Sequence, residues 1–220
     1  ALRAACGSHA PAPTVRNMPV YLSIDTEATG LREPNHLLQV GVVPVDGASR
    51  RVFRELGREI LLKCPSYEEL LPSLDDWNRK HNKGLIERAH REGEAPETLV
   101  AWFERYFAEP EVAKLLNGTR AILLGKSMSA LDIPILRRYL GWERYEKWFH
   151  HHTLDVTCVA RCLVDAGKMP AGTESSSKLI KFFGIRADVN HTALSDALDM
   201  ADAYAKMLDL LSPREAAKDA

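Results

Sequence analysis

Apolar residues recur along the chain with two different periods, and the change of period separates a strand-rich start from a helix-rich remainder. Residues 20–31 (VYLSIDTEATGL) begin as an apolar run of strand-forming residues and break at a Thr-Gly pair. Residues 37–45 (LLQVGVVPV) are predicted to form a second, buried strand ended by an Asp-Gly hairpin signal, and residues 51–63 a third. Consecutive strands joined by tight turns predict an antiparallel meander at the start of the fold.

From residue 66 onward the apolar period is that of helices, interrupted by two short apolar runs. Residues 67–91 are polar and broken by Pro and Gly, which predicts short helices, whereas residues 94–107 carry aromatic side chains at helical spacing, typical of a helix packed on a sheet. Residues 121–125 (AILLG) and 150–156 predict a fourth and a fifth strand. The remaining predicted helices cover residues 129–140, 142–149, 155–166, 177–184 and 191–211.

This order of elements predicts an α/β fold: a mixed five-stranded sheet, its first three strands antiparallel, with helices on both faces. A length of 220 residues suits one well-buried domain, which we place at residues 19–211. Residues 1–18 are rich in Ala, Pro and Arg, contain no acidic residue and do not begin with Met. A disordered leader or a cloning remnant is expected there, with the stub of an organellar transit peptide as the alternative. Residues 212–220 are expected to form a C-terminal tail.

Composition narrows the class of protein without naming a function. Lys and Arg number 29 against 30 Asp and Glu, giving a formal net charge of -1, so any site for a polyanion must be local. No apolar segment approaches the ~20 residues that a membrane span needs, so a soluble protein is expected, with no membrane partner. The four cysteines form no C-x-x-C pair, which favours a reducing compartment. We expect the cytoplasm, and leave an organelle or the nucleus open. Cys158 and Cys162, one helical turn apart, are interpreted as core thiols rather than half of a zinc site.

The candidate chemistry lies in carboxylates spread over three predicted elements. Asp25 and Glu27 are two apart in a strand and therefore point to one face of the sheet, where their charges repel unless a hard cation neutralises them. Asp132 begins a helix after a buried strand, and His191 and Asp196 open the last helix. Each residue alone is unremarkable, because most helical Asp residues are surface charges. Together, four carboxylates and one imidazole favour magnesium or manganese over zinc.

The segments that carry these residues resemble a known family. SIDTEATGL, SALDIPIL and HTALSDA are similar to the three motifs of the DEDDh group of 3′-to-5′ exonucleases, within the RNase H-like superfamily. The resemblance covers residues 19–211. Residues 74–85 (LDDWNRKHNKGL) and 145–162 look like oligoribonuclease, whereas DTEATGL and KFFGIRADVNHTALSDALDMADAY look more like polymerase proofreading exonucleases.

The resemblance implies a role for each of the five residues. Asp25 would bridge two ions, Mg²⁺ or Mn²⁺, with Glu27 and Asp196 completing the first metal site. Asp132 would serve the second site. His191 would be the general base that takes the proton from the attacking water, a role that suits imidazole because its pKa lies near working pH.

The resemblance also implies which residues contact the substrate, and at two points this sequence departs from the pattern of the family. Ala28, Thr29 and Leu31 match positions that hold the terminal nucleotide in relatives. Relatives usually carry an Asn four or five residues before the second-motif Asp, where this chain has Ser127 and Met128. Ser127 is kept as a candidate substrate contact from that loop.

The second departure concerns assembly. Oligoribonucleases have an aromatic residue that is used across a dimer interface, and His151 stands at that position here. A homodimer is therefore left open. The run His150-His151-His152 is interpreted as a chance polar run near a strand start rather than a metal site.

The sequence thus predicts a metal-dependent 3′-to-5′ exonuclease that releases nucleoside 5′-monophosphates from the 3′ ends of single-stranded DNA or RNA. The alternative is a non-catalytic nucleic-acid-binding module, or a proofreading or trimming partner of a larger polymerase or repair complex. The choice between RNA and DNA stays open, because it depends on contacts with the 2′-hydroxyl group.

Overall fold

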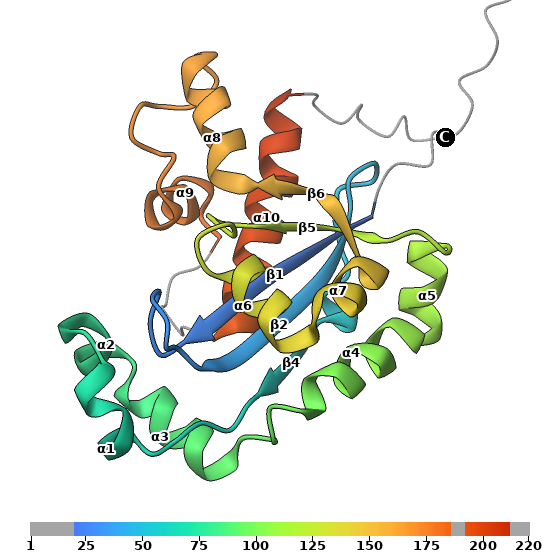
Figure 1. The fold of residues 1–220 in the computed structure, drawn as a ribbon. Coiled ribbons are helices and arrows are strands. Elements are labelled where there is room, and N and C mark those ends of the chain that lie inside the picture. The colour runs from blue at the N-terminus through green and yellow to red at the C-terminus, as the bar shows by residue number, and fades with distance from the viewer. Residues whose placement is uncertain (1–19, 186–191, 212–220) are drawn as a thin grey trace, which may run out of the picture.

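A mixed sheet of six strands forms the centre of the molecule (Figure 1). The structure, a computed structural model, describes residues 20–185 and 192–211. The strand order is β3-β2-β1-β5-β6, and β4 also pairs with β2. The pairs β1–β2, β2–β3 and β2–β4 are antiparallel, whereas β1–β5 and β5–β6 are parallel. The strands are β1 (Val20–Ala28), β2 (Leu37–Asp46), β3 (Arg51–Val52), β4 (Arg58–Leu61), β5 (Ala121–Gly125) and β6 (Phe149–Asp155).

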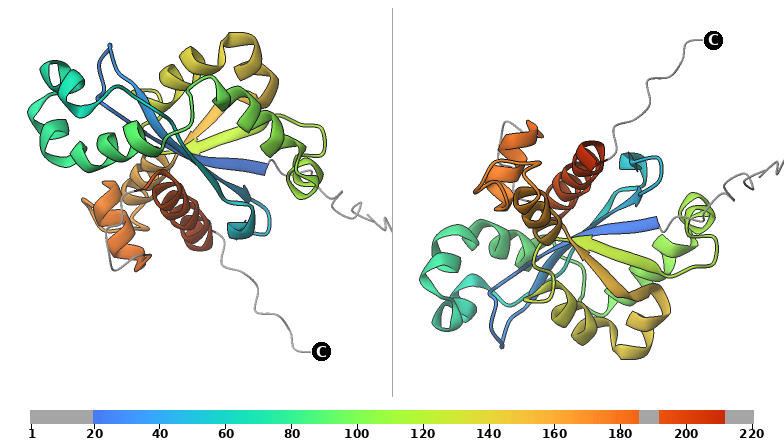
Figure 2. Two further views of the ribbon diagram at one scale, coloured as in Figure 1. Left: turned by 90° about the horizontal axis from the view of Figure 1, so that it is seen from below. Right: turned by 90° about the horizontal axis from the view of Figure 1, so that it is seen from above.

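Helices cover both faces of the sheet, which confirms the predicted fold class (Figure 2). The 19-residue helix α10 crosses one face together with α8 and α9, while α4 to α7 lie on the other. The helices are α1 (Tyr67–Leu70), α2 (Asp76–His81), α3 (Lys83–Glu92), α4 (Thr98–Ala108), α5 (Pro110–Leu116), α6 (Asp132–Leu140), α7 (Trp142–Trp148), α8 (Val156–Asp165), α9 (Ser176–Phe183) and α10 (Ala193–Leu211), with short 3₁₀ turns at Arg54–Leu56 and Leu71–Ser73.

One predicted strand is divided in two. The chain expected to pair continuously over residues 51–63 forms β3, then a 3₁₀ turn ending at Gly57, then β4. Both pieces pair with β2, so the meander is kept while the sheet gains a sixth strand. The interruption lies beside α10, since Leu194 Cδ1 would be 3.2 Å from a Cβ at Gly57.

Alternation along β1 supplies both layers of the core. Leu22 and Ile24 join the larger apolar cluster beneath α4, α6 and α7. Ser23 faces the other way, and its hydroxyl donates a 2.7 Å hydrogen bond to the carbonyl oxygen of Ala197 in α10. Side chains two apart in a strand share a face, so Asp25 and Glu27 also lie on the α10 side.

A third group of helices, α1 to α3, covers the end of the sheet where β1 turns into β2 (Figure 1). Leu38 of β2 and Cys64 pack there with Ile86 and Ala89 of α3. Asn82 fastens this layer to the sheet, because its side-chain amide donates a 3.0 Å hydrogen bond to the carbonyl oxygen of Ala28.

One further expectation concerns the two cysteines of α8. The interpretation of Cys158 and Cys162 as core thiols is wrong, because both are exposed on α8. Within residues 20–185 and 192–211, no helix combines the length and apolar character needed to cross a membrane. The predicted leader and tail lie outside the described residues.

Candidate metal centre and substrate pocket

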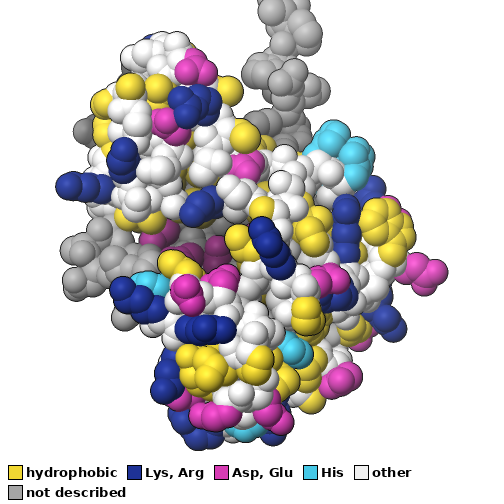
Figure 3. Space-filling model, turned by 60° about the vertical axis from the view of Figure 1, so that its left-hand side comes forward, with side chains coloured by type: hydrophobic (Ala, Val, Ile, Leu, Met, Phe, Trp, Pro, Cys, Tyr) yellow, Lys and Arg dark blue, Asp and Glu magenta, His cyan; other side chains and the backbone are white. Residues whose placement is uncertain are grey.

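Three carboxylates from two elements meet on the α10 side of the sheet. One oxygen each of Asp25, Glu27 and Asp196 lie within 4.8 Å of one another, and all three residues are half-buried. Figure 3 shows acidic side chains at the floor of a hollow between the α8–α9 region and the α1–α3 region, with Lys and Arg side chains around its rim. The spacing of two along β1 thus produces the shared face that the sequence predicts.

The fourth carboxylate, that of Asp132, approaches the same half of β1 from the opposite layer. The pairing of β1 with β5 stops at Ser23 opposite Leu124, whereas β1 continues to Ala28. The second half of β1 therefore has an edge that β5 does not cover. Asp132, in the first turn of α6, fills this place, and its Oδ1 accepts a 2.7 Å hydrogen bond from the Thr26 hydroxyl. Only 7% of Asp132 is exposed.

These carboxylates lie close together and are partly shielded from solvent, and both conditions raise their pKa values. Burial raises the pKa of Asp25 well above its ordinary value, and the charges of Asp132, Glu27 and Asp196 raise it further. Burial and the neighbouring carboxylates raise the pKa of Glu27 to about 7. Burial also raises the pKa of Asp132 to about 6, against the opposing effect of the Thr26 hydrogen bond. Ionising all four near neutral pH is therefore costly without added positive charge.

The donor set fits a hard divalent cation. Every ligand atom offered is a carboxylate oxygen, which magnesium, calcium and manganese prefer, and no nitrogen or sulfur donor belongs to the described group. A bound cation would invert the unfavourable charge balance that raises these pKa values. The structure thus brings Asp25, Glu27 and Asp196 together as a group that could bind metal, and Asp132 is near enough for its charge to raise the pKa of Asp25 and Glu27.

Helix α10 is held on the sheet by contacts that no motif indicated. A Cβ on Gly41 of β2 would lie 2.1 Å from the backbone nitrogen of Leu194, so only glycine allows the helix start to rest on the strand. The carboxylate of Glu59 and the side-chain oxygen of Gln39 accept hydrogen bonds from the Leu194 and Ala193 amides, at 2.9 and 3.1 Å. These contacts fix where Asp196 enters the site. Polar residues within predicted strands, Gln39 and Glu59, were the available signal for them.

The predicted general base, His191, lies outside the described residues. The helix that follows it begins at Ala193, and Thr192 and Ser195 exchange hydrogen bonds as a reciprocal N-terminal cap. The assignment of His191 therefore stays a prediction from sequence.

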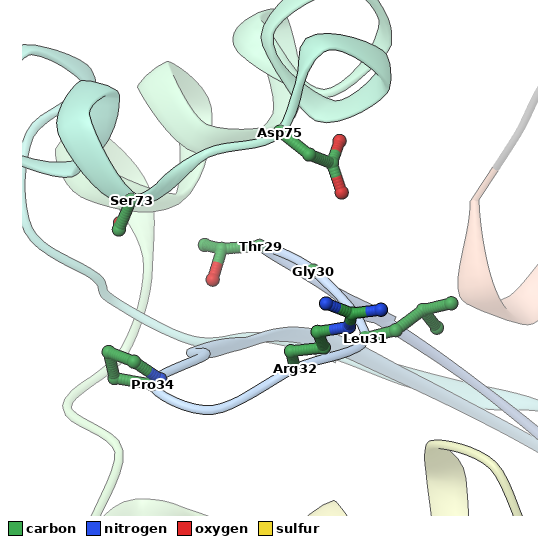
Figure 4. A pocket seen from close by; sticks show the side chains of 7 residues that line it. All are labelled: Thr29, Gly30, Leu31, Arg32, Pro34, Ser73 and Asp75. Atoms are coloured by element: carbon green, nitrogen blue, oxygen red, sulfur yellow. The ribbon is translucent and has the colours of Figure 1, made fainter.

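The turn after β1 borders a pocket of about 470 Å³. It is lined by Thr29, Gly30, Leu31, Arg32, Pro34, Ser73 and Asp75. Figure 4 shows the turn on one side and the α1–α2 connection on the other, with the Asp75 carboxylate directed toward the turn. The volume falls in the range of about 300–1,000 Å³ typical of small-ligand pockets.

The predicted substrate residues differ in accessibility at this turn. Ala28 and Thr29 are buried, and the Thr29 hydroxyl accepts a 2.9 Å hydrogen bond from the His36 amide. Leu31, in contrast, is 69% exposed and lines the pocket. Sequence reasoning missed Arg32, which lies in the turn itself, and Asp75, which approaches the turn only when α1 to α3 fold over the sheet. It also missed exposed Trp77 in α2.

Ser127 lies in the loop between β5 and α6. Its backbone adopts a left-handed conformation, with φ of 49°, and its amide donates a 2.8 Å hydrogen bond to the Asp155 carboxylate at the end of β6. The Ser127 side chain is exposed. Neighbouring Lys126 is also exposed. Its positive charge partly opposes the rise in the pKa of Asp25 and Asp132 that burial causes.

Sequence comparison finds similarity to curated oligoribonucleases. The oligoribonuclease of Shewanella oneidensis is 29% identical over 143 residues, and that of Shewanella putrefaciens is 27% identical over 143 residues. Each alignment covers 62% of this chain and 70% of the relative. No protein-family model matches the chain.

Solved structures with a similar fold are nucleases. The chain superposes on the nuclease domain of 3′hExo, described as a DEDDh family member bound to rAMP, with a TM-score of 0.61 and 13% identity, covering 90% of this chain and 96% of that one. Cell-death related nuclease 4 (CRN-4) gives a TM-score of 0.63 and 13% identity, covering 88% of this chain but only 65% of that chain's length. The RNase domain of yeast Pop2 gives 0.57 and 13%, covering 87% and 77%. At such identities the likeness establishes the fold alone.

Proposed function

We propose a defined reaction for this chain, whose relatives and fold support a DEDDh-type 3′-to-5′ exonuclease of the RNase H-like superfamily. The reaction is the stepwise release of nucleoside 5′-monophosphates from the 3′ end of single-stranded DNA or RNA. One observation carries the proposal. The second half of β1 presents Asp25 and Glu27 beside Asp196, with Asp132 held against the same strand by Thr26.

The four carboxylates would hold two divalent cations, magnesium or manganese. Asp25 would contact both ions, Glu27 and Asp196 would complete the first site, and Asp132 would belong to the second. When bound, a pair of such ions supplies charge stabilisation for the attacking and leaving oxygens of an in-line displacement. Thr26 would keep the Asp132 carboxylate in place as its charge is neutralised.

His191 would act as the general base. Its imidazole takes a proton from water, and the water oxygen forms a bond to the phosphorus of the last phosphodiester. The bond from phosphorus to the 3′ oxygen of the penultimate nucleotide breaks, and that oxygen takes up a proton from solvent. The products are a nucleoside 5′-monophosphate and a strand shorter by one nucleotide with a free 3′-hydroxyl.

The pocket beside the β1 turn would receive the terminal nucleotide. Exposed Leu31 offers an apolar surface to a base, the Thr29 hydroxyl and the exposed loop residue Ser127 offer polar contacts, and Arg32 offers a positive charge on the pocket wall. Trp77, which is 61% exposed, lies one residue before Asn78, whose side-chain nitrogen would be 3.5 Å from a Cβ at Gly30. The His81 ring stacks on Trp77, with centroids 4.8 Å apart, and the other face of the indole would stack on a base, an interaction that tolerates any sequence.

The reaction is tested with a single-stranded oligonucleotide labelled at its 5′ end. With Mg²⁺ or Mn²⁺, a free 3′ end should give a ladder of products shortened one nucleotide at a time, while a 3′-blocked strand and a circular strand stay intact. Asp25→Asn should remove the activity. Cutting of the circle at a comparable rate would refute exonuclease action, and binding without shortening in the unsubstituted protein would favour a non-catalytic module.

The choice of substrate is tested by comparing RNA and DNA of equal sequence, from dinucleotides to long strands. A Trp77→Ala variant reports on base stacking, because its loss should raise KM more than it lowers kcat. Trp142→Ala is a matched control, since Trp142 is also exposed and has one neighbouring side chain over its ring, Arg137, as Trp77 has His81, but lies in a different helix, α7. Equal effects of the two substitutions would remove Trp77 from the substrate site.

A further inference from the structure

Strand β6 contains a bulge made of three consecutive histidines. Ala121 of β5 pairs with Phe149, but Leu123 pairs with Thr153, so two steps along β5 correspond to four along β6. The surplus residues are among His150, His151 and His152. In a regular strand these side chains would alternate between the two faces of the sheet, and a bulge removes that alternation.

The bulge gathers the three imidazoles into one cluster. Ring centroids are 4.2 Å apart for His150–His151 and His151–His152, and 4.6 Å apart for His150–His152. One ring nitrogen from each histidine lies within 4.8 Å of the other two. His151 and His152 are exposed, on a strand at the edge of the sheet. Figure 3 shows a contiguous patch of histidine side chains, set apart from the hollow that contains the acidic side chains.

We propose that His150, His151 and His152 form a second metal site, which takes a divalent late transition metal such as Zn²⁺. Imidazole nitrogen is a preferred donor for zinc, copper and nickel, whereas the carboxylate group of β1 and α10 suits magnesium and manganese. Three protein ligands with a fourth position open to solvent are a common zinc arrangement. The chain therefore presents two sites of opposite donor chemistry.

The geometry needs only a small closure of the cluster. At zinc–nitrogen distances of about 2.0–2.1 Å, three corners of a tetrahedron lie about 3.4 Å apart. The present nitrogens are within 4.8 Å, and two of the three side chains are exposed, so changes in side-chain torsion can bring them together. The edge position leaves the open coordination place facing solvent rather than the core.

One hydrogen bond would change on binding. The backbone amide of His152 donates a 3.0 Å hydrogen bond to Nδ1 of His150. A neutral imidazole has one lone pair, so His150 must either turn that lone pair toward the metal or protonate Nδ1 and bind through Nε2. In both cases an exposed hydrogen bond is exchanged for a metal–nitrogen bond.

The site is tested on the full chain without a polyhistidine tag, after treatment with a chelator. Co²⁺ serves as the probe because its visible absorption reports tetrahedral nitrogen ligation, and Zn²⁺ is then used to displace it. Excess Mg²⁺ is present throughout to occupy the carboxylate group. We expect about one equivalent of Co²⁺ with a tetrahedral spectrum, displaced by one equivalent of Zn²⁺.

Variants assign the signal to the cluster. His151→Ala should weaken Zn²⁺ binding about tenfold or more, and the triple substitution of His150, His151 and His152 by Ala should abolish the tetrahedral spectrum. Asp25→Asn should leave it unchanged, as should His81→Ala, which removes an exposed histidine elsewhere. Far-ultraviolet circular dichroism checks that each variant is folded. Undiminished binding in the folded triple variant, or loss of binding in Asp25→Asn, would overturn the proposal.

Discussion

The hydroxyl of Thr26 donates a 2.7 Å hydrogen bond to Oδ1 of Asp132, joining the central strand to the first turn of α6 across 106 residues. Both side chains are buried. Thr26 therefore orients the one carboxylate of the group that comes from the opposite layer of the fold. In the sequence Asp25-Thr26-Glu27, the middle residue therefore also contributes to the site, by positioning Asp132.

Replacing this hydroxyl should weaken the protein. In Thr26→Val the buried Asp132 loses its side-chain donor and keeps only backbone donors, and the free energy of unfolding should fall by about 1–3 kcal/mol. Thr26→Ser keeps the hydroxyl and should retain most of that stability. Urea titrations at pH 8 in the presence of a chelator measure the difference. Unchanged stability in Thr26→Val would show that the hydrogen bond does not contribute, and a loss confined to Thr26→Ser would show that the methyl group does instead.

Gly41 should not tolerate a side chain. The Cβ of Gly41→Ala would lie 2.1 Å from the Leu194 nitrogen, a backbone atom that cannot rotate away. Displacing α10 should cost about 1–3 kcal/mol and should also weaken metal binding, because Asp196 moves with the helix. Thermal unfolding with and without Mn²⁺ measures both effects.

Gly84→Ala is a control for which we expect the opposite change in the free energy of unfolding. Gly84 lies inside α3, and a Cβ there would meet nothing within 4 Å. Alanine should therefore stabilise the protein by about 0.5–1 kcal/mol through helix propensity. A destabilising Gly84→Ala combined with a harmless Gly41→Ala would contradict the described packing of α10.

Without metal, stability should fall as pH rises through the neutral range. The folded protein holds protons on Glu27 up to about pH 7 and on Asp132 up to about pH 6, whereas the unfolded chain releases them near their ordinary values of 4.5 and 3.8. Between these limits the folded state binds more protons, so the free energy of unfolding decreases with pH. Melting curves from pH 4.5 to 8 in a chelator test this trend, and Glu27→Gln should flatten it. A melting temperature that rises over this range would contradict the assigned burial.

Divalent cations should reverse that loss. Mn²⁺ at about 100 times its dissociation constant should stabilise the folded state by about 2.7 kcal/mol. For a chain of this size, that corresponds to a rise of about 5–10 °C in Tm. Asp25→Asn should lose the shift. An unchanged rise in Tm in Asp25→Asn would show that the stabilising ion binds at another site. The variant in which His150, His151 and His152 are all replaced by Ala would then show whether that site is the histidine cluster of β6.

His191 should matter for turnover rather than for metal binding. His191→Ala should reduce kcat by about 10²–10⁴-fold, as expected for a positioned general base. The Mn²⁺-dependent rise in Tm should persist, because the carboxylates are unchanged. Near-normal turnover in this variant would exclude His191 from proton transfer.

Much of the fold was predictable because its signals are local. The alternation around Asp25 and the run AILLG predict β1 and β5, and the predicted fold class is confirmed. The split of the third strand was not predictable, because it is associated with Gly57 and the packing of α10 on the sheet, a contact between distant segments. Cys158 and Cys162 were misplaced for a similar reason. Their face of α8 is set by which helices pack against it, and helical spacing alone does not determine that choice.

In the candidate site, too, some residues could be predicted from local sequence, whereas others depend on contacts between distant segments. Asp25 and Glu27 could be placed on one face from their spacing, and Asp132 and Asp196 from the resemblance of their segments. Residues that position these carboxylates, such as Gln39 and Glu59, gave no motif because their partners are backbone amides of α10. The histidine run was interpreted from sequence as a chance polar run near a strand start rather than a metal site. The bulge in β6 changes that expectation.

The bond between Ser23 and Ala197 closes a loop of 174 residues, and the helix it anchors brings Asp196 to the carboxylates of β1. During synthesis, β1 leaves the ribosome long before α10 exists. A nascent chain therefore carries an incomplete set of carboxylates for most of its production. A complete set of carboxylates would arise only when α10 docks onto β1.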